Sequence, residues 1–172
     1  MSDLIEIVDY DPRWPDLFRA YRVDLAAALG PTALRIDHVG STAVPGLAAK
    51  PVIDIQVAVP DQDDLDSYRA TLEATGLRLH YLEPGWSMFQ PTGERTRHVH
   101  VTTAGSPRER EQRLFVAYLR TFPERRDGYA ALKRELAARF RDDRDGYTMA
   151  KSAFVAVTLA LAAEWAAAEG WS

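Results

Sequence analysis

The sequence predicts an α/β (α+β) fold in which helices flank a mixed β-sheet and the C-terminal third is helical. Three patterns lead to this prediction. Residues 52–59 alternate like a strand, residues 77–103 contain short strands separated by turns, and apolar residues recur at helical spacing from residue 106 onward. The 172 residues suit a single domain over 1–172 with a core that needs no disulfides.

The composition excludes several classes of function. The chain has no cysteine, which rules out disulfides, thiol catalysis and thiolate zinc sites. A formal net charge of −4 argues against a basic nucleic-acid binder. The N-terminus lacks the features of a signal peptide, and the longest apolar stretch, near 153–163, is too short to span a bilayer. We therefore expect a cytoplasmic protein with no membrane or nucleic-acid partner.

A strand and a helix are expected first. Residues 4–8 are apolar enough for a short strand, and Asp11-Pro12 is typical of a helix start. Apolar residues then recur at helical spacing from Trp14 to Leu29. Gly30-Pro31 would end this helix.

The middle of the chain predicts the sheet. Strands are expected over 34–39 and 52–59, joined by a loop rich in glycine and proline. A helix is expected over 61–75. Residues 77–82, 86–90 and 97–103 then predict an antiparallel meander with turns at 83–85 and 91–93.

Three helices are expected in the last third. They would begin at Ser106-Pro107, near Pro123 and near Asp145. The charged run 108–111 is expected to form a solvated helix face with local ion pairs, each worth tenths of a kcal/mol.

The loop before the strand 52–59 offers groups suited to phosphate and metal. Gly40 lets the backbone approach a ligand, Ser41 and Thr42 supply hydroxyls, and exposed amides in such a turn bind anions. Lys50 adds a point charge. Asp54 follows on the next strand, where it can face the ligand, and Mg²⁺ prefers one or two carboxylates together with phosphate oxygens.

An ordinary structural role is the alternative for each of these residues. Gly-Ser is a common turn, and a strand aspartate is often exposed at a sheet edge. The clustering favours function, because a buried unpaired charge is costly and needs a compensating partner.

A longer motif supports the functional interpretation. The segment from His38 to Ile55, HVGSTAVPGLAAKPVIDI, resembles the signature of the GrpB family of small bacterial proteins. Segments similar to the family also occur at 11–15, 98–101, 129–133 and 147–154. The resemblance implies a single nucleotidyltransferase-fold domain, and in some bacteria a similar domain is fused to dephospho-coenzyme A kinase.

The resemblance also implies roles for individual residues. In the nucleotidyltransferase superfamily a Gly-Ser holds the triphosphate, two carboxylates one residue apart hold metal ions, and a later strand supplies a third carboxylate. Here Asp54 matches the first carboxylate, Gln56 stands at the second, and the later strand offers His98 and His100. Imidazole favours zinc, manganese or nickel over magnesium. His100 could instead act as a general base or a phosphate donor.

These considerations give three sets of candidate site residues. The catalytic candidates are Asp54, Lys50 and His100. The phosphate- or nucleotide-binding candidates are His38, Gly40, Ser41, Thr42, Lys50 and Lys151, although His38 could simply cap its strand. The metal candidates are Asp54, Gln56, His98 and His100. The expected cofactor is Mg²⁺ or Mn²⁺, ahead of zinc or nickel.

Three functions remain open from the sequence. The first is an enzyme that binds a nucleotide or phosphorylated small molecule with a divalent metal and transfers a nucleotidyl or phosphoryl group. The second is a module that binds a nucleotide or coenzyme A precursor without chemistry, as Gln56 in place of an acid would favour. The third is a scaffold or chaperone-like partner domain. The sequence does not indicate an oligomeric state.

Overall fold

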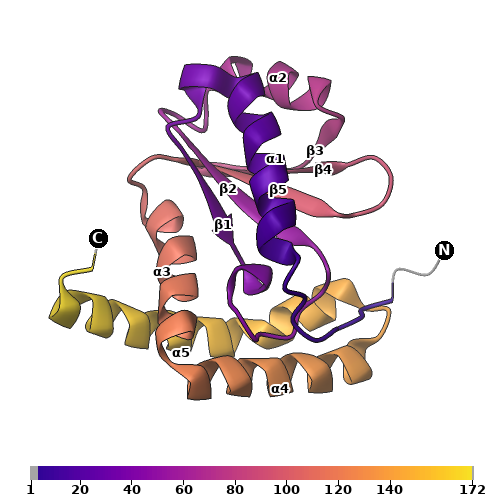
Figure 1. Ribbon diagram of the computed structural model, residues 1–172, viewed down its shortest axis with the longest axis vertical. Helices are drawn as coiled ribbons and strands as arrows, with labels where there is room; N and C mark the ends of the chain where they lie inside the picture. The colour runs from indigo at the N-terminus through magenta and orange to yellow at the C-terminus, as the bar shows by residue number, and fades with distance from the viewer. Residues whose placement is uncertain (1–3, 172) are drawn as a thin grey trace.

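The computed structural model describes residues 4–171 and contains one five-stranded sheet (Figure 1). The strands are β1 (Arg35–Val39), β2 (Ile53–Val59), β3 (Leu77–Glu83), β4 (Trp86–Pro91) and β5 (Arg97–Thr103). Their order is β1-β2-β5-β4-β3, in which β2 and β5 are parallel and the other neighbours are antiparallel. The predicted mixed sheet and the antiparallel meander are confirmed.

Two helices cover one face of the sheet. They are α1 (Trp14–Leu29) and the short α2 (Arg69–Ala74). The alternation in β2 turns Ile53, Ile55, Val57 and Val59 toward this side, where they share the main core with buried side chains of both helices. Because these strand residues are at most 1% exposed, β2 is the most deeply anchored strand of the site.

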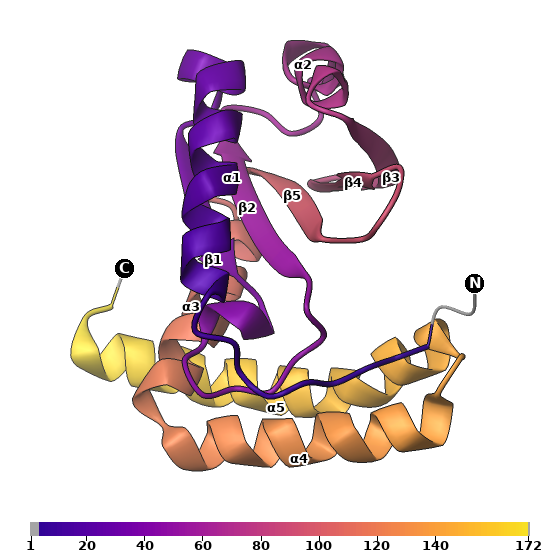
Figure 2. The same cartoon turned by 45° about the vertical axis from the view of Figure 1, so that its right-hand side comes forward.

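The C-terminal third consists of α3 (Pro107–Thr121), α4 (Pro123–Phe140) and α5 (Arg144–Glu169), as predicted. Helix α3 packs against β1 and β5. Helices α4 and α5 lie side by side across one end of the sheet, as Figures 1 and 2 show. This arrangement brings side chains of α4 and α5 close to the loop between β1 and β2.

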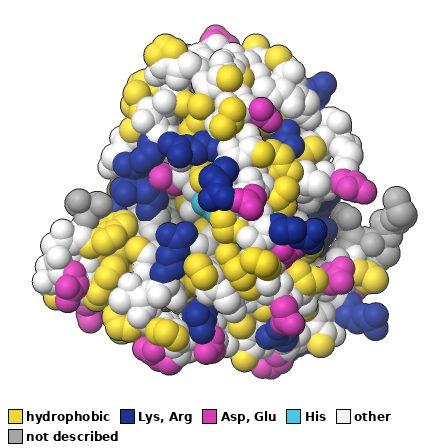
Figure 3. Space-filling model, in the orientation of Figure 1, with side chains coloured by type: hydrophobic (Ala, Val, Ile, Leu, Met, Phe, Trp, Pro, Cys, Tyr) yellow, Lys and Arg dark blue, Asp and Glu magenta, His cyan; other side chains and the backbone are white. Residues whose placement is uncertain are grey.

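Helix α5 is long and apolar. Among the described residues it has the length and mean hydropathy, 1.3 over 18 residues, that could suit a membrane span, and 17% of that stretch is buried. Its Ala162 and Ala166 pack against α3, and α5 also contacts α4. On the face drawn in Figure 3, hydrophobic side chains are interspersed with charged ones.

Two predicted elements are shorter than expected. Residues 4–8 form only one bridge, between Val8 and Ala49, instead of a strand. The helix expected over 61–75 is reduced to a 3₁₀ turn, Leu65–Ser67, followed by α2. The Asp61 carboxylate accepts the Asp63 amide, and this local bond competes with helix formation at the start of the segment.

The expectation of a solvated face at 108–111 is wrong for Glu109. This side chain is 1% exposed and forms ion pairs with Arg35 on β1 and with Arg113. Its second carboxylate oxygen accepts the Gly105 amide at 3.1 Å. Glu109 therefore ties the start of α3 to the edge strand of the sheet.

We predict that Glu109→Gln lowers the free energy of unfolding by about 1–3 kcal/mol, because it weakens a buried charge-assisted network. Urea denaturation measures this difference. The control is Glu111→Gln on the exposed side of the same helix, which should change stability by no more than about 0.5 kcal/mol. Equal effects of the two substitutions would contradict the assigned role of Glu109.

Candidate functional site

The site begins with three polar side chains on two parallel strands. Asp54 on β2 is directly paired with His98 on β5, and His100 follows two residues later on the same face. This face is opposite to the α1 face and looks toward the C-terminal helices. The sheet register therefore brings both histidines to one carboxylate.

Asp54 is held by hydrogen bonds to a single oxygen. His98 Nδ1 lies 3.1 Å and His100 Nε2 lies 3.2 Å from Asp54 Oδ1. Burial acts to raise the pKa of Asp54, but the bonds from His100 and His98 outweigh it and hold the pKa well below its usual range. Asp54 is therefore ionised, with Oδ1 occupied as an acceptor.

Trp86 determines which nitrogen of His100 carries the proton. Its indole Nε1 donates to His100 Nδ1 at 3.2 Å, and the two rings are stacked. An indole can only donate, so Nδ1 of His100 must accept. The neutral His100 ring then carries its proton on Nε2 and donates it to Asp54.

The loop between β1 and β2 passes close to the second oxygen of Asp54. Gly40 adopts φ 69° and ψ −171°, a conformation that is essentially restricted to glycine. A Cβ at Gly40 would lie 2.9 Å from the Asp54 Cβ and closer still to Oδ2. The missing side chain of Gly40 therefore leaves room for Oδ2. Arg120 fixes the next turn by donating two hydrogen bonds to the Ala43 carbonyl.

Three lysines converge on this loop from separate elements. Lys50 lies in the loop before β2, Lys133 on α4 and Lys151 on α5. Lys133 is only 2% exposed, and its Nζ donates to Ser41 Oγ at 2.9 Å. The chain has 21 lysine and arginine residues, and these three are its only lysines. Every lysine of the sequence thus lies at the site.

Aromatic rings support the three ammonium groups. Lys50 Nζ and Lys151 Nζ lie 4.6 Å and 4.3 Å from the Tyr147 ring centroid, and Lys133 Nζ lies 4.6 Å from that of Tyr129. Such contacts stabilise desolvated cations. They hold the charges in place without neutralising them.

Burial disfavours the charged form of each lysine. It lowers the pKa of Lys133 to about 7, assisted by the charge of Lys151. Burial and the charge of Lys50 lower the pKa of Lys151 to about 8. The pKa of Lys50 is also lowered, mainly by burial. An anion bound among these groups would reverse these shifts.

Asp54, the three lysines and the hydroxyls of Ser41 and Thr42 line one cavity of about 560 Å³, which we call cavity one. Tyr147 also lines it, and its buried hydroxyl has no hydrogen-bond partner among the described residues. Burial raises the pKa of Tyr147 to about 12, so this hydroxyl keeps its proton and remains a donor. The cavity therefore offers a ligand several hydrogen-bond donors, including the Tyr147 hydroxyl and the lysine ammonium groups.

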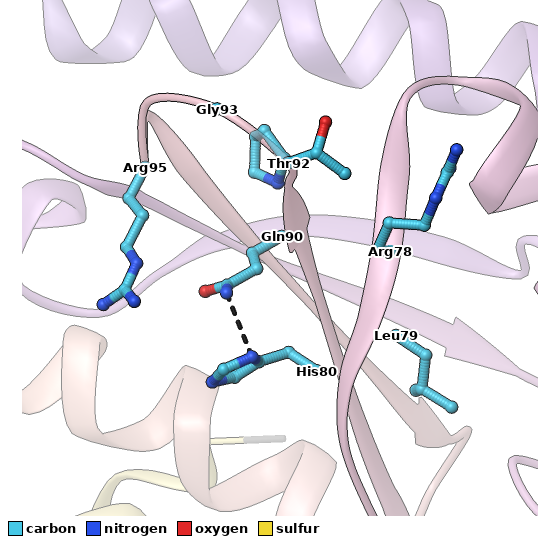
Figure 4. A pocket seen from close by; sticks show the side chains of 8 residues that line it. Arg78, Leu79, His80, Gln90, Thr92, Gly93 and Arg95 are labelled. Atoms are coloured by element: carbon cyan, nitrogen blue, oxygen red, sulfur yellow. Dashed lines mark hydrogen bonds between the residues drawn. The ribbon is translucent and has the colours of Figure 1, made fainter.

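A smaller cavity of about 310 Å³ adjoins cavity one near the loop between β4 and β5. The two cavities share His80, Gln90 and Arg95. Figure 4 shows the bond between Gln90 Nε2 and His80 Nδ1, 3.0 Å long, with Arg95 extending beside this pair. A ligand in cavity one could thus extend along the polar edge of the sheet.

The donor set fits a divalent cation in part. Ligand atoms of Asp54, His98 and His100 lie within 4.8 Å of one another. Asp54 Oδ2 is unoccupied by the histidines. The His98 nitrogen that faces Asp54 is Nδ1, which carries the proton of their bond, and Nε2 lies on the far side of the ring, away from a metal held by Asp54. His100 could join only by giving up its Nε2 proton, which the Trp86 bond opposes. Asp54 is therefore the better-placed ligand, and His98 could join it through Nδ1 only if its proton moves to Nε2.

Three of the predicted site residues do not line cavity one: Gly40, which packs against Asp54, and His38 and Gln56, which lie farther away. His38 is on the α1 face of the sheet, stacked on Phe18, and its Nε2 lies 3.0 Å from Thr42 Oγ1. Burial lowers the pKa of His38 to about 4, so it is neutral and supports the loop from behind. Gln56 is fully buried and donates to Thr102 Oγ1 and to the Glu109 carbonyl.

The candidate site residues drawn from the sequence did not include Lys133, Tyr147 or Trp86, although the resemblance to the family made Tyr147 a plausible residue of the pocket wall. Lys133 ends the family-like segment 129–133 but was given no role. The signal that could have identified it is the restriction of lysine to three positions in an arginine-rich chain. The hydrogen bond from Trp86 to His100 depends on strand pairing and has no such signal.

Comparisons with known proteins identify relatives of this chain. The family model described as GrpB protein matches residues 4–160. A UPF0157 protein from Halalkalibacterium halodurans is 39% identical over 153 residues, 88% of this chain and 78% of that protein. A protein named dephospho-CoA kinase from Mycolicibacterium paratuberculosis is 32% identical over 195 residues, 97% of this chain and 48% of that protein.

A solved structure of a protein named GrpB is also similar to this chain. The crystal structure of conserved protein GrpB from Enterococcus faecalis matches 97% of this chain and 100% of that chain, with a TM-score of 0.86 and 29% identity. A more distant similarity, with a TM-score of 0.48 and 16% identity over 75% of this chain and 40% of that chain, is to a cytoplasmic RNA terminal U-transferase. This chain belongs to the GrpB family.

We predict that Gly40→Ala destabilises the protein by about 2–4 kcal/mol, because it adds backbone strain to a clash with Asp54. The control is Gly105→Ala, at φ 75° with no atom within 4 Å of the added Cβ, where strain alone should cost about 1–2 kcal/mol. Urea unfolding compares the two. A smaller loss at Gly40 than at Gly105 would contradict the close packing described for Gly40.

We predict that Lys133→Met stabilises the protein without added ligand at pH 7 and below. The folded state disfavours protonation of Lys133, so between pH 7 and about 10 the unfolded chain binds more protons and wild-type stability rises with pH. Removing the amine removes this penalty and flattens the rise. A gain of about 1 kcal/mol would appear as about 2–4 °C in the melting temperature.

The control for this measurement is Arg139→Met on the same helix, where an exposed arginine is not among the charges that lower the pKa of Lys133. It should leave the pH profile of stability unchanged. An identical profile for wild type and Lys133→Met would show that Lys133 carries no buried proton-linked penalty.

Proposed function

We propose that this protein binds the phosphate chain of a nucleotide or a related phosphorylated small molecule in cavity one. The observation that carries the proposal is the convergence of all three lysines, from a loop and two helices, on one cavity with a hydroxyl-bearing turn. Buried cations of like charge repel one another and favour an anionic partner. A di- or triphosphate is the metabolite group that matches several cations side by side.

Different residues would bind the phosphate groups and the metal ion. Ser41 and Thr42 would donate hydroxyl hydrogen bonds, while Lys50, Lys133 and Lys151 would neutralise phosphate charge. Asp54, with His98, would hold a divalent cation such as Mg²⁺ or Mn²⁺ that arrives with the phosphates, and the metal would polarise a phosphoryl oxygen. The histidine ligand favours Mn²⁺ over Mg²⁺. The Tyr147 hydroxyl would donate to an anionic oxygen nearby.

The reaction that we propose is transfer of a nucleotidyl or phosphoryl group to a small acceptor, in the cytoplasm where such nucleotides are available. The second candidate is a module that binds a nucleotide or coenzyme A precursor without chemistry. Two observations favour this alternative. Gln56 is used structurally where a second carboxylate would be wanted, and a relative of which this chain spans about half is named dephospho-CoA kinase.

We predict that nucleoside di- and triphosphates raise the melting temperature of the wild-type protein, and that adenosine does not. At a concentration about 100 times Kd the stabilisation is about 2.7 kcal/mol. This corresponds to a rise of about 5–10 °C for a domain of this size. The panel includes coenzyme A and dephospho-coenzyme A, each with and without Mg²⁺ or Mn²⁺.

Variants assign the effect to cavity one. Lys133→Met should abolish the shift, Asp54→Asn should remove the part that depends on metal, and Arg139→Met should behave like the wild type. Mass spectrometry of reactions with a nucleoside triphosphate and a metabolite extract tests transfer, because a product would gain the mass of a nucleotidyl or phosphoryl group. No shift with any phosphorylated compound would refute the proposal. A shift without turnover would favour the binding module.

A further inference from the structure

A further cavity, of about 650 Å³, lies on the other side of Asp54 from cavity one. We call it cavity two. It is formed where the end of β1, the first half of α3 and the middle of α5 meet, and it shares Asp54 and His100 with cavity one. Gly40 lines cavity two and faces Asp54 Oδ2, the oxygen that the histidines leave open. The two cavities therefore meet at one carboxylate.

The walls of cavity two differ in chemistry from those of cavity one. Among the described residues none of its lining side chains is a lysine, and apolar side chains of Val39, Phe115 and Leu159 form much of its surface. Such a wall favours an apolar or uncharged body over a phosphate. A second phosphate chain is thus a poor occupant, whereas a partly apolar small molecule fits.

One buried polar atom in this wall lacks a partner. The side-chain oxygen of Gln112, Oε1, is buried and accepts no hydrogen bond from the described residues. An unpaired buried acceptor is costly, and a ligand with an N–H or O–H group could satisfy it. Glu111 and Arg108 lie at the exposed rim, so that Asp54 is the charged group inside the cavity.

We infer that cavity two binds a small molecule with a partly apolar body and a hydroxyl or amino group, and that this molecule is the acceptor for the phosphate ligand of cavity one. The acceptor role rests on the proposed function. Its nucleophilic group would lie beside Asp54, where the two cavities meet.

A nucleotidyl group would be transferred where the two cavities meet. The acceptor oxygen or nitrogen forms a bond to the α-phosphorus of a nucleoside triphosphate in cavity one. The bond from that phosphorus to the bridging oxygen breaks, and pyrophosphate leaves among the lysines. The proton of the acceptor passes to solvent through cavity two. Separate cavities keep the nucleophile and the leaving group on opposite sides of the phosphorus, as an in-line displacement requires.

The test uses 2-phenylethanol and phenethylamine as probes, with ethylbenzene as the matched compound that lacks a donor. Saturation-transfer and titration NMR on the full chain should give Kd on the order of 1–10 mM for the two donors. Ethylbenzene should bind at least about fivefold more weakly, because it leaves Gln112 Oε1 unpaired. Gln112→Leu should remove this preference for donors.

Two tryptophan variants on α5 localise the binding. Leu159→Trp, at a residue lining cavity two, should abolish probe binding, while Leu161→Trp, at a partly exposed position outside it, should not. The melting temperature of each variant establishes that it is folded. Equal binding of ethylbenzene, or probe binding that survives Leu159→Trp, would overturn the inference, as would no binding of either donor probe to the wild type.

The same titrations with adenosine triphosphate present separate this inference from the proposed function. Probe and nucleotide should bind together, each leaving the Kd of the other within about threefold. Mutual exclusion would overturn the acceptor role. Probe binding in a protein that binds no phosphorylated compound would refute the proposed function and the acceptor role, while supporting cavity two as a separate binding site.

Discussion

The ionised carboxylate of Asp54 is the charge around which the rest of the site is arranged. It lies on the most deeply anchored strand, where a lone charge would be strongly unfavourable. Two histidine N–H groups from β5 and the nearby lysines compensate it. The parallel pairing of β2 with β5 is therefore as important to the site as the carboxylate itself, since it determines where the histidines lie.

Much of the fold follows from patterns that are local in the sequence. The alternation over 52–59 and the turns of the meander predict their strands well, because both patterns reflect the burial of one strand face. The exceptions involve contacts distant in sequence. Glu109 is buried because Arg35 lies opposite it. Residues 4–8 form one bridge, to Ala49, while Ile5 donates its amide to the Arg141 carbonyl.

The site was predictable to the extent that its residues are neighbours in the chain. Gly40, Ser41, Lys50 and Asp54 fall within one motif, and the sheet register brings His98 and His100 to it. His38 looked equivalent to these residues, but its position in β1 turns it to the opposite face. The residues supplied by the C-terminal helices could be located only once the fold was known.

The use of lysine rather than arginine has a physical reason. An arginine keeps its charge in almost any environment, whereas a lysine can lose its proton when it is buried. Lys133 and Lys151 have their pKa lowered to about 7 and about 8, so the empty cavity can shed part of its positive charge. An anion that enters restores the protons and gains three donors per ammonium group. Arginines in their place would hold full positive charge in the empty cavity and would destabilise the fold whenever no ligand was bound.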